Sequence, residues 1–236
     1  MKRAGSIWTA LYWGFTAACF AVVGAMAAFY APVEATMGVV QKIFYVHLPS
    51  AINTFVAFMV VFVAGIGYLA QRKSWWDDLA LAAAKAGVVF CSVTLLTGMV
   101  WARAAWGTWW TWSPRLTLTL LLWLLYVVYL IIRSSIDSEQ RRAVVAAAYG
   151  IVAFLDVPLV YLSARLLPDI HPTAMTMTRE MRITLASWFL PVTLLNAGFI
   201  AAGYAIAVRS RNGRGRSQDV EAAARPMKLD LLGGAA

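Results

Sequence analysis

The sequence has few charged residues, few cysteines and few histidines, and each scarcity excludes a class of protein. Only 13% of its 236 residues are charged, about half of the roughly 25% found in soluble domains, which excludes water as the main solvent. The two cysteines, Cys19 and Cys91, each lie in an apolar run and predict neither a disulfide framework nor a metal site. No Cys-x-x-Cys-His motif is present, which excludes a c-type cytochrome.

Long apolar segments take the place of charge. The mean hydropathy is +0.70, and a membrane-crossing helix needs about 20 mostly apolar residues. The first such stretch resembles a signal peptide but exceeds the usual length of about 7–15 apolar residues, so we expect an uncleaved span. The fold class is therefore all-α, a polytopic integral membrane protein with six transmembrane helices. The expected spans are about 7–30, 48–69, 79–100, 116–132, 143–163 and 183–208.

The Lys and Arg residues predict the orientation of the chain. Of the 20, thirteen lie before span one, after span six, or in the short loops that follow spans two and four. Six lie in the three opposite segments, about 31–47, 101–115 and 164–182, and Lys85 lies within span three. Because short cytoplasmic loops carry an excess of Lys and Arg, both termini are predicted to be cytoplasmic. We interpret the net charge of +9 as a topology signal and predict no nucleic-acid binding.

The chain divides into a membrane part and a polar tail. We predict one six-helix domain over residues 1–208, with a tryptophan-rich loop at 101–115 on the side opposite the termini. Residues 209–236 are polar and rich in Arg and Gly. That composition predicts a disordered basic cytoplasmic tail.

Both histidines of the chain lie in segments opposite the termini. His47 ends the first of these segments and His171 lies in the third, so the topology places them on one side of the membrane. Histidine is the commonest metal ligand. Two interfacial histidines that only form hydrogen bonds are the alternative.

The second opposite segment holds five of the chain's eleven tryptophans. Tryptophan is typical of membrane–water interfaces, but an aromatic belt spreads over all helix ends, whereas this cluster is confined to one loop. If the segment is helical, Trp106, Trp109 and Trp110 share one face. Gly107 would let a flat ligand approach the backbone closely. The cluster also contains Trp101 and Trp112, and the segment carries two arginines, Arg103 and Arg115.

These features together favour one kind of ligand. Arginine pairs with carboxylates in a bidentate fork, indoles stack on flat apolar rings, and imidazoles from two loops can reach a central metal. The expected ligand is therefore flat and apolar, with a metal at its centre and carboxylates on its edge. Haem has all of these properties, and His47 and His171 are its candidate iron ligands.

The tryptophan segment also resembles a known motif. Residues 106–117, Trp-Gly-Thr-Trp-Trp-Thr-Trp-Ser-Pro-Arg-Leu-Thr, are similar to the tryptophan-rich motif of the haem-handling superfamily that includes the CcmC, CcmF and CcsA proteins. The chain length, the six spans and one histidine on each side of the motif resemble the CcmC family. Residues 45–50 and 156–161, followed by His171-Pro172, extend the resemblance, which covers most of 5–205.

The resemblance implies a role in the biogenesis of c-type cytochromes. It implies that the chain transiently binds haem b at the periplasmic face of the bacterial inner membrane. It also implies that the chain is not an enzyme. With the small membrane protein CcmD it would transfer haem to the haem chaperone CcmE, and the ABC-type pair CcmA and CcmB would help release the loaded chaperone. The family's two outer-loop histidines correspond to His47 and His171. Its tryptophan motif corresponds to Trp106, Gly107, Trp109, Trp110 and Trp112.

Two features complicate this assignment. The family motif usually has Asp after the last tryptophan, and this chain has Ser113, so an acidic group is missing there. The third opposite segment also contains Met175, Met177 and Met181, and methionine ligates haem iron in some proteins. We prefer His171 as the ligand because imidazole binds both oxidation states of iron.

Two charged residues fall within predicted spans. Lys85 lies near the cytoplasmic end of its span, where a lysine can extend toward the interface. Asp156 lies nearer the opposite face, two residues before Pro158. It either orients one of the histidines or has a structural role inside the bundle.

Three other functions compete with haem transfer. A transmembrane haem transporter needs a polar path, but spans one, two, four and six contain no charge. A cytochrome c haem lyase similar to CcmF or CcsA is longer and has more histidines. In an accessory subunit the tryptophans would only anchor the chain, and a haem absorption spectrum would distinguish that case.

Overall fold

The computed structural model describes residues 2–167 and 176–233, and these are helical apart from short connections. Within them the only extended pairing is an isolated bridge between Glu34 and Gly38. The short helices η1 and η2 are a π-helix and a 3-10 helix. The elements are α1 (Lys2–Ala25), η1 (Met26–Tyr30), η2 (Val39–Ile43), α2 (Phe44–Gln71), α3 (Ser74–Trp106), α4 (Pro114–Ser134), α5 (Glu139–Ala153), α6 (Asp156–Leu166) and α7 (Arg179–Gly233).

Six segments are long and apolar enough to cross a membrane, which confirms the predicted number of spans. Their cores coincide with the predicted ranges, and most extend further at one or both ends because helices continue into polar and aromatic residues. The chain is therefore an all-α polytopic membrane protein. The six segments are Ile7–Tyr30, Val39–Gln71, Ser74–Trp106, Pro114–Ser134, Glu139–Ser163 and Arg179–Gly213.

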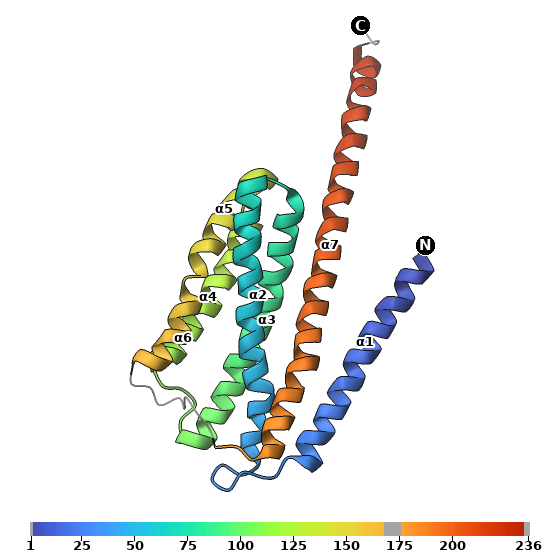
Figure 1. Cartoon of the computed structure of the whole chain (residues 1–236). Helices are drawn as coiled ribbons and strands as arrows, with labels where there is room; N and C mark the ends of the chain where they lie inside the picture. Colours follow the sequence, from blue (N-terminus) through green and yellow to red (C-terminus); the bar gives the residue numbers. More distant parts are fainter. Residues whose placement is uncertain (1, 168–175, 234–236) are drawn as a thin grey trace.

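The helices run up and down, so that loops gather at two opposite ends (Figure 1). One end, here called the terminal end, carries the start of α1, the end of α7 and the connections at 72–73 and 135–138. The other, here called the site end, carries the connections 31–38 and 107–113 and the start of α7. The described parts of the three segments predicted to face the same way, 31–47, 101–115 and 164–167 with 176–182, therefore lie at one end. Helices α2 to α6 form a bundle, α7 packs on α2 and α3, and α1 packs mainly on α7.

Small residues allow the central helices to approach one another closely. Helices α2 and α3 make the most extensive contact in the bundle, and a Cβ at Gly87 would lie only 2.3 Å from Cε1 of Phe58. Phe58 stacks on Tyr126 of α4 with ring centroids 3.5 Å apart. Such packing replaces the hydrophobic effect as the main source of helix association in a membrane.

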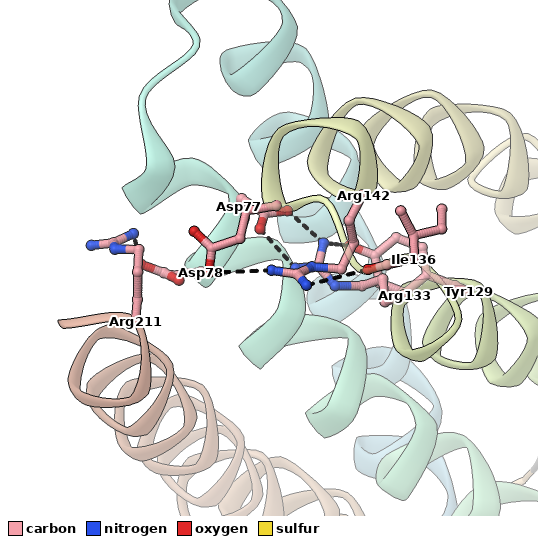
Figure 2. A network of polar contacts seen from close by, with 8 residues as sticks. Asp77, Asp78, Tyr129, Arg133, Ile136, Arg142 and Arg211 are labelled. Carbon is pink, nitrogen blue, oxygen red and sulfur yellow. Dashed lines mark hydrogen bonds and ion pairs between the residues drawn. The ribbon is translucent and has the colours of Figure 1, made fainter. Parts of the chain in front are cut away.

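Two ion pairs connect the helices at the terminal end (Figure 2). Arg133 of α4 donates to both carboxylate oxygens of Asp77 of α3, at 2.5 and 2.7 Å. Arg211 of α7 donates to the carboxylate of the adjacent Asp78. Lys85, further along α3, is exposed, as expected for a lysine that extends toward the interface.

Two predictions about helix ends differ from the structure. Span five is broken at Phe154–Leu155 into α5 and α6, because Pro158 lacks the N–H that would bond to the carbonyl of Phe154. The predicted disordered tail over 209–236 is helical as far as Gly233. Extending an existing helix needs no new nucleation, and the Arg211–Asp78 pair shows that packing continues past residue 208.

Candidate functional site

A cavity of about 530 Å³ opens among α2, α3, α4 and α6 at the site end. Its volume lies within the range of about 300–1,000 Å³ typical of small-molecule sites. Aliphatic and aromatic side chains form most of the wall. The residues predicted for the site that line this wall are His47, Trp106, Trp109, Trp110 and Arg115, with Met177 beside them.

His47 enters the cavity from the first turn of α2. Its Nδ1 lies 3.0 Å from Oγ1 of Thr97 on α3. The imidazole also lies against the next residue of α3, since a Cβ at Gly98 would be 3.1 Å from Cε1. The histidine is thus fixed at the boundary between the two most closely packed helices.

The expectation that Trp106, Trp109 and Trp110 share one helix face required a continuous helix, and the tryptophan segment is not one. Helix α3 ends at Trp106, and Gly107 adopts φ +74°, a left-handed conformation that stops the helix. Trp106 therefore reaches the cavity from the helix end, while Trp109 and Trp110 reach it from the unwound connection 107–113. The three indoles still meet at one wall, but by a turn of the backbone and not by helical spacing.

The tryptophans differ in exposure and therefore in what they can contact. Trp101 is 7% exposed and packs edge-on against Trp106 at 5.3 Å, and both indoles line the cavity. Trp109 is 55% exposed although it lines the cavity. Trp112 is 76% exposed and lies off the cavity wall, with its ring edge-on to Trp110.

The two arginines of the segment have different positions. Arg115 is the second residue of α4 and lines the cavity. Arg103 instead donates to the carbonyl of Gly107 and helps to end α3. A Cβ at Gly107 would meet nothing within 4 Å. The structure therefore explains Gly107 by its backbone conformation, and neither it nor Arg103 lines the cavity.

The connection before α4 holds buried polar atoms that lack a partner in the described part of the chain. They are Nε1 of Trp110, Oγ1 of Thr111 and Oγ of Ser113. A buried donor left without an acceptor costs about 1–3 kcal/mol, so such atoms indicate a place for a ligand or water. Of the three residues only Trp110 lines the cavity, together with Arg115, so a carboxylate in the cavity would supply an acceptor for its indole N–H. At Ser113 a hydroxyl can donate, whereas the family's usual aspartate would repel a carboxylate.

The second candidate iron ligand, His171, lies outside the described residues, as does Met175. Of the two remaining methionines, Met177 lines the cavity and Met181 is 3% exposed within the bundle. Asp156 is 5% exposed, and its carboxylate oxygens have no partner among the described residues. Because no described group hydrogen-bonds to the Asp156 carboxylate, the structure gives no support to Asp156 as the group that orients His47.

Sequence reasoning missed Thr97 and Gly98. Thr97 is 50 residues from His47, and a threonine in an apolar span has many ordinary roles. Only the packing of α2 on α3 brings the two together. The helix stop at Gly107, by contrast, had a signal, because a glycine that follows a last turn containing a basic residue, here Arg103, is a typical helix end.

Replacing Gly107 by alanine should destabilise the fold by about 1–2 kcal/mol, because a left-handed conformation disfavours any residue with a Cβ. Gly14→Ala is the matched control, since both glycines have open space at the Cβ position but only Gly107 has a positive φ. Thermal unfolding in detergent should show a lower midpoint for Gly107→Ala alone. Equal midpoints for the two variants would contradict the assignment.

Comparison with known proteins places the chain among named relatives. The family profile described as Heme exporter protein C matches residues 2–223. Curated proteins of that name match at 31% identity in Bradyrhizobium diazoefficiens (72% of this chain, 64% of the relative) and at 35% in Rhodobacter capsulatus (56% and 50%). The protein of that name in Escherichia coli strain K12 is 30% identical (64% and 62%). The aligned part spans between half and two thirds of each relative. Because the profile matches nearly the whole chain, the chain belongs to the Heme exporter protein C (CcmC) family.

Proposed function

We propose that the chain binds haem in the site-end cavity and transfers it to a haem chaperone during the biogenesis of c-type cytochromes. The observation that carries the proposal is that His47, four indoles and Arg115 line one otherwise apolar cavity. An imidazole can hold the iron, and the arginine can pair with a propionate. The family membership supports the same cargo.

The chain's own residues would hold this cargo without changing it covalently. Apolar walls exclude water from the ring, while Arg115 and the indole N–H of Trp110 pair with its carboxylates. Trp109 is both part of the wall and more than half exposed, so one border of the site faces outward. Such a site suits a holder that hands over its cargo, and we propose that the chain is not an enzyme.

We propose that the site faces the periplasm of the bacterial inner membrane. The excess of Lys and Arg in the segments of the terminal end supports a cytoplasmic position for that end. The cavity lies at the opposite end of the same bundle. By the family resemblance, the partners would be CcmE as acceptor, CcmD, and the ABC-type pair CcmA and CcmB.

The packing beneath the cavity supports transfer at one face over passage through the bundle. Leu122 lines the cavity and is fully buried. One helical turn deeper, Phe58 and Tyr126 stack and are also fully buried. This apolar layer leaves no path for a large ring between the central helices.

A transfer assay tests the proposal. The purified protein loaded with haem would be mixed with a haem-free chaperone domain, and the haem content of each would be measured after separation. We expect haem to move to the chaperone. Retention of all haem on this chain, with an active chaperone shown to accept free haem, would contradict a transfer function.

Replacing Trp109 and Trp110 together by alanine should weaken haem binding by roughly 2 kcal/mol, or about thirtyfold. The reason is the loss of two indoles that line the cavity. Trp112→Ala is the matched control, since Trp112 belongs to the same segment but lies off the wall. Haem titration followed by absorbance measures the effect. Equal affinities of the double variant and the control would show that Trp109 and Trp110 do not bind haem and only anchor the chain at the membrane interface.

A further inference from the structure

We propose that Thr97 is a positioning residue for His47, setting which imidazole nitrogen carries the proton and therefore which can bind iron. Gly98, the next residue of α3, leaves the space in which the ring lies. The effect of Thr97 on iron binding rests on the proposed function, whereas its effect on the tautomer of the imidazole does not.

The hydrogen-bond geometry at Thr97 determines the direction of its bond to His47. Oγ1 of Thr97 lies 2.6 Å from the carbonyl oxygen of Val93 and 3.2 Å from that of Thr94. A hydroxyl has one proton to donate, and these backbone carbonyls can only accept. The hydroxyl oxygen therefore accepts from His47, whose Nδ1 lies 3.0 Å away.

This direction fixes the tautomer of a neutral His47. With the proton on Nδ1, the lone pair lies on Nε2, the nitrogen that is then able to ligate a metal. Histidines that bind metals generally donate their other N–H to a fixed acceptor, which orients the ring. Here the acceptor is a neutral hydroxyl. It makes the imidazole less basic than a carboxylate would, which suits a ligand that must release its cargo.

Gly98 restricts the position of the ring. A Cβ at this position would lie 3.1 Å from Cε1 and 3.7 Å from Nδ1 of His47. The first distance is tighter than ordinary van der Waals contact, so any larger residue at this position would require the imidazole to shift. Thr97 thus sets the proton position of the imidazole, and the adjacent Gly98 leaves room for the ring.

An ordinary structural role for Thr97 has to be separated from this one. Thr94 also donates to the carbonyl four residues earlier, at 2.9 Å from Phe90, and such bonds are common for threonine in membrane helices. Thr94 lies on the same helix and at the same cavity. A variant at Thr94 therefore removes a comparable hydroxyl without removing the described partner of His47.

The first experiment reads the tautomer directly in the haem-free protein. The chain has two histidines, so ¹⁵N-histidine labelling of a His171→Ala protein in bilayers gives NMR signals from His47 alone. At a pH where the ring is neutral, we expect the Nδ1–H tautomer. Thr97→Val should shift the signal toward the Nε2–H form, while Thr97→Ser and Thr94→Val should keep the original form. A wild-type Nε2–H form, or an unchanged signal in Thr97→Val, would overturn the proposal.

The second experiment connects the tautomer to haem and keeps the two proposals distinguishable. In otherwise wild-type protein, Thr97→Val should weaken haem binding by about 10- to 100-fold and shift the Soret band, and Thr97→Ser should restore both. If Thr97→Val binds haem with unchanged affinity and spectrum, the positioning role is wrong. If wild type binds no haem, the proposed function fails, while the NMR result still decides how His47 is held.

Discussion

Cells that carry His47→Ala or His171→Ala should lose nearly all of their c-type cytochromes. Each substitution removes one proposed iron ligand, and His47 is the imidazole on the cavity wall. Haem held by one ligand fewer would dissociate before it reached the chaperone. Haem-stained gels of membrane fractions measure the effect, with the amount of the variant protein checked by immunoblot.

Met177→Leu is the matched control for these two substitutions. Met177 also lines the cavity, and leucine keeps its approximate volume without the sulfur. We expect normal cytochrome levels in this variant if His171 is the second ligand. Normal levels in His171→Ala together with a loss in Met177→Leu would show that the methionine ligates the iron instead.

Replacing Asp77 by alanine should lower the free energy of unfolding by about 3–5 kcal/mol, the usual cost of leaving a buried charge unpaired. Its partner Arg133 is 6% exposed at the side chain, and the pair is bidentate. Besides Asp77, the hydrogen-bond partner of this guanidinium in the described part of the chain is Tyr129, 3.5 Å away (Figure 2). Unfolding monitored by circular dichroism in detergent measures the loss.

An ion pair within α5, at the same end, provides the control. Glu139 and Arg142 are 3.7 Å apart, one turn apart on α5, and the Glu139 side chain is 52% exposed. Glu139→Ala should cost no more than about 0.5 kcal/mol. Replacing Asp77 and Arg133 together by apolar residues of similar size should recover most of the stability. Similar losses for Asp77→Ala and Glu139→Ala would contradict the burial of the first pair.

The six spans and the grouping of loops followed from the sequence because both depend on local properties. Apolar length determines which segments can cross a membrane, and alternating spans determine which loops share a side. That reasoning placed His47, the tryptophan segment and the start of the sixth span at one end, where the structure has them. The position of His171 itself stays a prediction.

The details of the site depended on packing that no local pattern encodes. The contact between His47 and Thr97 arises from the register of α2 on α3. The buried hydrogen bond of 3.1 Å between Asn53 and Asn196, which are 143 residues apart, arises from the packing of α2 on α7. Where a local signal did exist, as at Gly107 and Pro158, the helix endings could have been read from the sequence.

The absorption spectrum of the purified protein, supplied with haem, tests the central claim most directly. Wild type would be compared with the His47→Ala, His171→Ala double variant at equal protein concentration. The account predicts a Soret band in wild type that is lost or shifted in the double variant. Identical spectra, with or without bound haem, would contradict a haem site with these ligands at the site end.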